Sequence, residues 1–221
     1  MPGRLIAIGD IHGCADALAA LLSAVRPAPA DCLVTLGDYV DRGPDSRRAI
    51  DQLLDLRRQC NLIPLLGNHD QMLLRLAEGD GSLLDDWLSQ GGTATLASFG
   101  CPRAEEVPEK YLAFLRQCQA MHVTPRHFFL HGNYLADVPL DQQPEWVVYW
   151  ESLRTREPGP HFSGKTAIVG HTSQRSGEVL DLGYLKCIDT CCYRGLWLTA
   201  LAPETGQMWQ ANQHGEIRQL P

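Results

Sequence analysis

The sequence lacks any long apolar run and any excess of positive charge. None of its stretches reaches the roughly 18 apolar residues that a membrane helix needs, and the apolar run in residues 1–9 is too short for a secretion signal. The 19 basic and 26 acidic side chains give a formal net charge of −7, so no broad positive field exists to hold nucleic acid or anionic lipid. We therefore expect a cytoplasmic protein that binds neither nucleic acid nor membrane, and in which any anionic ligand is captured by local charges.

The eight cysteines show no C-x-x-C spacing, which argues against a disulfide framework or a structural zinc site. We expect them to be reduced thiols that mostly serve in packing. The adjacent Cys191 and Cys192 could form a metal or redox site, but no neighbouring cysteine or histidine completes one.

Nothing in the sequence divides the chain. It has no internal repeat, no low-complexity segment and no linker long enough to separate two parts, and 221 residues suffice to bury one core. We therefore expect a single domain over residues 1–221.

Apolar runs alternate with amphipathic stretches in a way typical of strands that feed helices. Residues 5–8, 32–36 and 62–66 are expected strands. A helix with buried positions from Ala17 to Val25 should end at Pro27, and Pro44 is a plausible first residue of the next helix. We expect a helical insertion over residues 71–124, approximately. Further strands are expected at 128–130, 167–169, 185–188 and 197–201, with a hairpin turn at 203–206.

Polar residues follow five of the expected strands. Because the carboxyl ends of parallel strands lie together, these residues can converge on one crevice. They are Asp10 and His12, Asp38 and Asp41, Asn68 and His69, His131, and His171.

The residue types in this set predict a metal centre. Two carboxylates, an amide oxygen and three imidazoles suit manganese, iron or zinc. Six ligands from five loops are more than one ion needs, whereas two ions about 3.5 to 4 Å apart that share one carboxylate would use them all. A lone Asp after a strand is often a helix cap, and Asp70 is better explained that way; Asp10 and Asp38 could be caps too.

Five motifs then carry a resemblance to a known family. They are Gly9-Asp10-Ile11-His12-Gly13, Gly37-Asp38-Tyr39-Val40-Asp41-Arg42-Gly43, Gly67-Asn68-His69-Asp70, His131-Gly132 and Gly170-His171-Thr172. In this order they resemble the phosphoprotein phosphatase family of calcineurin-like metallophosphoesterases. Together with Trp87 and Gly91-Gly92, they are most similar to the small bacterial and phage (bacteriophage lambda type) serine/threonine protein phosphatases.

The resemblance implies a fold and a mechanism. The fold is α/β, with two mixed β-sheets packed as a sandwich and flanking helices. Two divalent ions, manganese before iron or zinc, would be held by Asp10, His12, Asp38, Asn68, His131 and His171, with Asp38 bridging. A metal-bridging hydroxide would attack phosphorus directly, without a phosphoenzyme.

The same resemblance gives roles to three neighbouring residues. His69 would be the general acid, Asp41 would hold His69 in its protonated orientation, and Arg42 would grip two phosphate oxygens.

One position departs from the family pattern. An arginine usually stands two residues after the Trp that corresponds to Trp150, and here that residue is Ser152. Arg154 and Arg194 are the two candidates to replace it as a phosphate ligand, and Arg194 is favoured because it stands where the family has an aromatic residue near the active site.

The expected function is that of an enzyme, a phosphomonoesterase of the protein serine/threonine phosphatase type that also accepts phosphotyrosine. Its partner would be a phosphorylated protein or a small phosphoester. The alternative is a dinucleotide polyphosphate hydrolase resembling the symmetrical diadenosine tetraphosphatases. A non-catalytic scaffold is disfavoured because no ligand and no acid is missing.

Overall fold

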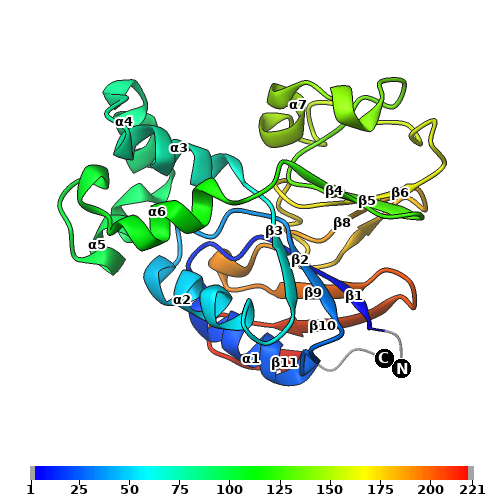
Figure 1. Ribbon diagram of the computed structural model, residues 1–221, viewed down its shortest axis with the longest axis horizontal. Coiled ribbons are helices and arrows are strands. Elements are labelled where there is room, and N and C mark those ends of the chain that lie inside the picture. Colours follow the sequence, from blue (N-terminus) through cyan, green and yellow to red (C-terminus); the bar gives the residue numbers. More distant parts are fainter. Residues whose placement is uncertain (1–2, 219–221) are drawn as a thin grey trace.

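Two mixed β-sheets packed face to face, with helices on their outer faces, form the core of the molecule (Figure 1). The structure is a computed structural model, and it describes residues 3–218. The two-sheet α/β architecture confirms the expected fold class.

The first sheet has the strand order β11-β10-β9-β1-β2-β3. Its strands are β1 (Leu5–Ile8), β2 (Cys32–Thr35), β3 (Asn61–Pro64), β9 (Leu198–Ala202), β10 (Gln207–Ala211) and β11 (Ile217–Arg218). The strands β1, β2 and β3 run parallel, whereas β9 and β10 are antiparallel to their neighbours.

The second sheet has the order β4-β5-β6-β8-β7. Its strands are β4 (Met121–Val123), β5 (His127–Leu130), β6 (Thr166–Val169), β7 (Leu180–Asp181) and β8 (Leu185–Cys187). Here β5, β6 and β8 run parallel, and β4 and β7 form antiparallel edges.

Side chains alternate between the two faces of each sheet, and this alternation builds the layers. In β1, Ala7 points into an apolar cluster between the sheets, while Ile6 contributes to the cluster beneath the helices. From the second sheet, Phe129 and Ile168 enter the same inner cluster. Burial of a side chain such as Phe129 or Ile168 stabilises the fold by about 1.5 to 3 kcal/mol, so the two sheets are held firmly against each other.

The helices lie on the outer faces and at one side of the sheets (Figure 1). They are α1 (Ala15–Val25), α2 (Ser46–Leu56), α3 (Asn68–Ala77), α4 (Leu84–Trp87), α5 (Thr93–Phe99), α6 (Glu109–Arg116) and α7 (Glu145–Trp150). None of the helices within residues 3–218 has the length and apolar character needed to cross a membrane.

Two helix boundaries test the sequence expectations. α1 ends at Val25, where Arg26 takes a left-handed conformation just before Pro27, as expected. The expected start of α2 at Pro44 is wrong, because the Asp45 side chain accepts the backbone N–H of Arg48 and caps a helix that begins at Ser46.

The helical insertion, α3 to α6, also ends earlier than expected. Its last helix stops at Arg116, and Met121–Val123 form β4, which pairs antiparallel with β5. Three residues that include a histidine carry too little alternation to be recognised as a strand without that partner.

Candidate metal centre and active site

All six expected metal ligands lie in one buried cluster at the carboxyl ends of parallel strands from both sheets. Asp10 and His12 follow β1, Asp38 follows β2 and Asn68 follows β3, whereas His131 and His171 follow β5 and β6 of the other sheet. The sequence-based expectation that these loops converge is confirmed.

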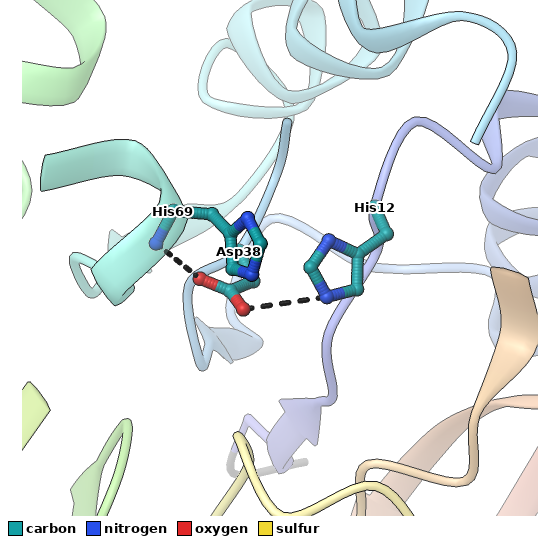
Figure 2. Close-up of side chains that lie close together, drawn as sticks. All are labelled: His12, Asp38 and His69. Atoms are coloured by element: carbon teal, nitrogen blue, oxygen red, sulfur yellow. Dashed lines mark hydrogen bonds and ion pairs between the residues drawn. The ribbon is translucent and has the colours of Figure 1, made fainter. Parts of the chain in front are cut away.

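Asp38 lies at the middle of this cluster. Its Oδ2 is 3.3 Å from His12 Nε2, and its Oδ1 is 3.4 Å from His131 Nε2. Figure 2 shows the carboxylate between His12 and the start of α3, where the backbone N–H of His69 donates to Asp38 Oδ1 at 3.1 Å. Potential ligand atoms of Asp38, His131 and His171 lie within 4.8 Å of one another, and so do those of His12, Asp38 and His69.

Two histidine rings each turn one nitrogen toward this cluster. His131 Nδ1 donates to the Leu36 carbonyl oxygen at 2.8 Å, so His131 Nε2 is the nitrogen that faces the cluster. His171 Nε2 donates to the Trp150 carbonyl oxygen at 3.1 Å, so His171 Nδ1 faces it. Both of these nitrogens lie 3.0 Å from the same oxygen, Asn68 Oδ1.

Imidazole nitrogens, an amide oxygen and a carboxylate that converge in this way form a typical ligand set for a metal ion. The donor set therefore fits a metal ion, with Asp38 shared between a group on the His12 side and a group on the His131 side. Imidazole nitrogen and carboxylate oxygen suit manganese, iron and zinc alike.

The electrostatics of the cluster agree with this fit. Burial, together with repulsion from Asp189 and Asp38, raises the pKa of Asp10 well above its ordinary value. Burial and the nearby Arg42 lower the pKa of His12, and burial lowers the pKa of His171 to about 3, so both imidazoles are neutral, as metal binding requires.

The pKa of Asp38 is shifted in the opposite direction to that of Asp10. Burial alone would raise the pKa of Asp38, but the nearby rings of His131 and His69 and the guanidinium of Arg42 hold it well below its ordinary value. The central carboxylate is therefore ionised and can accept a cation on each side.

Two glycines allow the backbone to approach the carboxylates closely. A Cβ atom at Gly67 would lie 2.1 Å from Asp38 Oδ1, and one at Gly170 would lie 2.1 Å from Asp10 Oδ1. Asp10 can thus accept the backbone N–H of His171 at 3.0 and 3.2 Å, which ties β1 to the loop after β6.

Asp70 contacts backbone N–H groups rather than the cluster. Its Oδ2 accepts from Asp38 at 2.8 Å and Gly67 at 3.0 Å, and its Oδ1 accepts from Tyr39 at 3.0 Å. Asp70 is therefore a cap of α3 that also fixes the Asp38 loop, as the sequence indicated.

His69 and Asp41 form a hydrogen-bonded pair beside the cluster. His69 Nδ1 donates to Asp41 Oδ2 at 2.7 Å, and both side chains are buried. Thr95, on α5, accepts the backbone N–H of Asp41 at 2.8 Å and donates to Asp41 Oδ1 at 2.7 Å. Burial raises the pKa of Asp41 in spite of the hydrogen bonds from His69 and Thr95.

Arg42 links the cluster of expected ligands to the His69–Asp41 pair. Its Nη1 donates to His12 Nε2 and its Nη2 to His69 Nε2, both at 2.8 Å. The guanidinium group also stacks on Tyr193, 4.6 Å from the ring centre. Arg42 is thus half-buried and bridges His12 to His69.

The two other arginines considered as phosphate ligands lie near the site but make different contacts. Arg154 is exposed and donates to the Ser173 carbonyl oxygen, two residues beyond His171. Arg194 is exposed and packs 5.6 Å from the ring centre of Tyr193, the residue that also contacts Arg42. Neither guanidinium group contacts the six expected ligands within the described part of the chain.

Sequence reasoning did not assign Thr95, Tyr193 or Asp189 to the site. Asp189 is buried near Asp10 and Asp38, accepting from the Ser173 hydroxyl at 2.7 Å and the Cys191 backbone N–H at 3.0 Å. Its position directly after the run 185–188 was the only available signal. Thr95 follows Gly91-Gly92 in the insertion, which gave no hint of a contact with Asp41.

Nitrogen and oxygen side chains that gather at the joined strand ends of a two-sheet α/β fold are the arrangement expected of a metal-dependent phosphoesterase. The family model described as calcineurin-like phosphoesterase matches residues 3–180, and the chain belongs to that family.

Relatives with two different activities are similar to this chain. It is 32% identical over 200 residues to serine/threonine-protein phosphatase 1 of Salmonella typhimurium, covering 87% of this chain and 88% of that protein. It is 33% identical over 180 residues to a symmetrical bis(5'-nucleosyl)-tetraphosphatase of Thioalkalivibrio sulfidiphilus, covering 68% of this chain and 64% of that protein. A solved structure of a candidate diadenosine tetraphosphatase has a TM-score of 0.73 at 25% identity, covering 96% of this chain and 95% of the other.

Proposed function

We propose that this chain is a dinuclear metal-dependent phosphomonoesterase that removes phosphate from serine and threonine side chains of proteins, and from tyrosine. The observation that carries the proposal is the ionised carboxylate of Asp38, which lies between His12 and His131 with Arg42 beside it. The relative from Salmonella typhimurium, which matches over most of both chains, supports the choice of a phosphoprotein substrate.

In this proposal two divalent ions, manganese first, are held by the six clustered side chains. Asp10, His12 and Asp38 would bind one ion, and Asp38, Asn68, His131 and His171 the other. When bound, the ions would supply positive charge for the phosphoryl oxygens and lower the pKa of a coordinated water.

The residues of the chain itself would manage the leaving group and the phosphate charge. His69 Nε2, with Asp41 on its other nitrogen, would give a proton to the departing serine or threonine oxygen. Arg42 has two parallel Nη donors, which suit two phosphate oxygens once they turn from His12 and His69.

Removal and restoration of metal tests the proposal. Chelation should abolish hydrolysis of p-nitrophenyl phosphate, and manganese, iron and zinc added separately should restore it to different extents. Asp38→Asn should lower kcat/KM by a factor of at least about 1,000, because one carboxylate serves both ions. Asp137→Asn, at an exposed aspartate, is the matched control. Full activity of Asp38→Asn would exclude the dinuclear arrangement.

Hydrolysis of dinucleotide polyphosphates is the second candidate function. It is supported by the relative from Thioalkalivibrio sulfidiphilus, of which this chain covers 64%. The metal-loaded protein should therefore be compared on phosphoserine, phosphothreonine and phosphotyrosine peptides and on diadenosine tetraphosphate. A higher kcat/KM on diadenosine tetraphosphate than on every peptide would replace the first candidate by the second.

A further inference from the structure

A groove of about 430 Å³ opens between α3 and α7, directly beside the candidate metal centre. Both helices lie at the top of Figure 1. The link to the centre is short: the groove is lined by Trp150, whose carbonyl oxygen accepts the ring N–H of His171 at 3.1 Å, and by Gln71, three residues after Asn68. The groove and the candidate metal centre are therefore connected through α3 and through the end of α7.

An exposed tryptophan forms one wall of the groove. Trp146 is 64% exposed, which is unusual for so large an apolar side chain. Its ring lies parallel to that of Trp150, with 6.1 Å between the ring centres and an angle of 3° between the planes. Trp150 is itself held, because its indole N–H donates to Gln71 Oε1 at 2.9 Å. The indole of Trp146 is therefore a preformed flat surface whose position is tied to the metal ligands.

The charged side chains around this surface differ in whether they have a partner of opposite charge. Arg75 is paired with Asp80, and Glu78 lies 3.4 Å from Arg116, so these two groove residues have charged partners. Glu145 has no cationic partner among residues 3–218; its contact is with the Gln71 amide, which donates to Glu145 Oε1 at 3.4 Å. One carboxylate thus remains free next to the exposed indole.

An aromatic face beside a free carboxylate is suited to a guanidinium group, which stacks on indole and forms paired hydrogen bonds to carboxylate. A nucleobase could also stack on indole, but its attached phosphates would be repelled by Glu145 and Glu78 unless they reached the metal centre. We propose that this groove binds an arginine side chain of a phosphorylated protein substrate, a few residues from the phosphorylated side chain. The inference rests on the proposed phosphoprotein phosphatase function and narrows its substrate class.

The test uses a series of phosphoserine peptides that differ only in the position of one arginine. The arginine is moved from three residues before the phosphoserine to three after it, and an all-alanine peptide is the reference. At one or two positions arginine should raise kcat/KM about tenfold, the ratio produced by a cation–π contact combined with an ion pair. The measured quantity is this ratio, since it is independent of the metal content of each preparation.

Two substitutions should remove the preference. Trp146→Ala and Glu145→Gln should each lower the ratio by about threefold, because each leaves the other contact in place, and the double variant should bring the ratio close to one. The matched control is Phe162→Ala, because Phe162 is 65% exposed but does not line the groove. That variant should keep the ratio of the unaltered protein.

The outcomes separate this inference from the function on which it rests. Hydrolysis of all the peptides at equal rates, or a ratio that Trp146→Ala leaves intact, overturns the arginine site but not the phosphatase function. A loss of activity in Trp146→Ala that is confined to diadenosine tetraphosphate assigns the groove to a nucleobase and overturns the arginine site. Absence of hydrolysis of every phosphopeptide overturns both.

Discussion

The hydrogen bonds of Asp41 show how single residues set the chemistry of the site. Its two carboxylate oxygens are divided between His69 and Thr95, and its own N–H is bound by the same threonine hydroxyl. Thr95 lies 54 residues further along the chain, in the helical insertion. The insertion therefore takes part in orienting the expected general acid, although none of its helices beyond α3 contributes an expected metal ligand.

Replacement of Thr95 by valine should impair catalysis more than folding. The variant keeps the shape of the side chain but leaves an oxygen and an N–H of Asp41 unbonded, at a cost of about 1 to 3 kcal/mol. If that cost falls on the transition state, kcat/KM for phosphoserine falls roughly 5- to 150-fold. The loss on p-nitrophenyl phosphate should be smaller, because that leaving group needs no proton.

Two variants serve as controls for Thr95→Val. Thr95→Ser restores the hydroxyl and should recover most of the activity, whereas Thr93→Val, at an exposed position of α5, should have no effect. Equal losses on the alkyl and aryl substrates would mean that Thr95 does not act through the acid.

Gly170→Ala should weaken metal binding. The added methyl group would lie 2.1 Å from Asp10 Oδ1, so the carboxylate or the loop that carries His171 must move. We expect manganese affinity, measured by calorimetry, to fall at least about tenfold, which corresponds to roughly 1.4 kcal/mol. Gly159→Ala is the control, because a Cβ at Gly159 would meet no atom within 4 Å. Unchanged affinity in Gly170→Ala would show that Asp10 is not a ligand.

At the residue scale, the sequence identified the charged groups and Asp41, which binds His69, but not the residues that position Asp41 and Arg42. Asp38 and His131 stand out because polar residues directly follow apolar strands and adjoin glycine. Thr95 and Tyr193 act through contacts with Asp41 and Arg42 that only the folded chain creates. Threonine and tyrosine are also common on ordinary surfaces, so their residue types carried no signal.

At the scale of elements, the ends of β1 and β2 are joined by a partly exposed ion pair. Asp31 Oδ2 accepts from Arg4 Nη2 at 2.6 Å and Nε at 3.1 Å, and the carboxylate also accepts the backbone N–H groups of Arg4 and Ala28. The Arg4 side chain, as hydrogen-bond donor, lowers the pKa of Asp31 to about 2. The carboxylate therefore holds the loop that leads from α1 into β2.

Asp31→Asn should destabilise the fold in a pH-dependent way. The pKa of Asp31 is lower in the folded chain than in the unfolded one, so its contribution is present above about pH 4 and is lost as the pH falls through about 2. After allowance for the partly exposed Arg4, we expect Asp31→Asn to lower the unfolding free energy by about 1 to 2 kcal/mol at pH 7. Denaturant unfolding of both proteins between pH 2 and 7 measures the difference.

The control for Asp31→Asn is Asp16→Asn, because Asp16 also pairs with an arginine but is 59% exposed. That variant should change the unfolding free energy by less than about 0.5 kcal/mol at any pH. A difference for Asp31→Asn that stays constant down to pH 2 would mean that the effect arises from packing and not from charge.

Elements with strong internal patterns were predicted well, and those defined by a partner were not. The strands β1, β2, β5 and β6 are apolar runs within a residue or two of their expected bounds. The strand β7 has two residues, and so does β11; both exist only through pairing with β8 and β10. The short helix α7 was not assigned either, because six residues rich in aromatic side chains have no clear helical period.

At the scale of the whole molecule, the helical insertion shares its core with the first sheet. One continuous apolar cluster contains Ile6 of β1, Leu53 of α2, Leu73 of α3 and Leu115 of α6. A second cluster then joins the first sheet to the other through residues such as Val34 and Phe129. No layer can lose its packing without exposing apolar surface of its neighbour.

We propose, on this basis, that residues 1–221 are one domain that unfolds in a single cooperative step. Far-ultraviolet circular dichroism and tryptophan fluorescence should give coincident transitions in urea, because helices and sheets lose structure together. Leu115→Ala, in α6 of the insertion, should lower the urea midpoint of both signals equally, because such a cavity lowers the unfolding free energy by roughly 2 to 5 kcal/mol. Leu84→Ala is the matched control, since Leu84 is 43% exposed and its loss creates no cavity. If Leu115→Ala instead produced an early loss of helical signal while the fluorescence transition stayed in place, the insertion would be a separate folding unit and the single-domain proposal would be wrong.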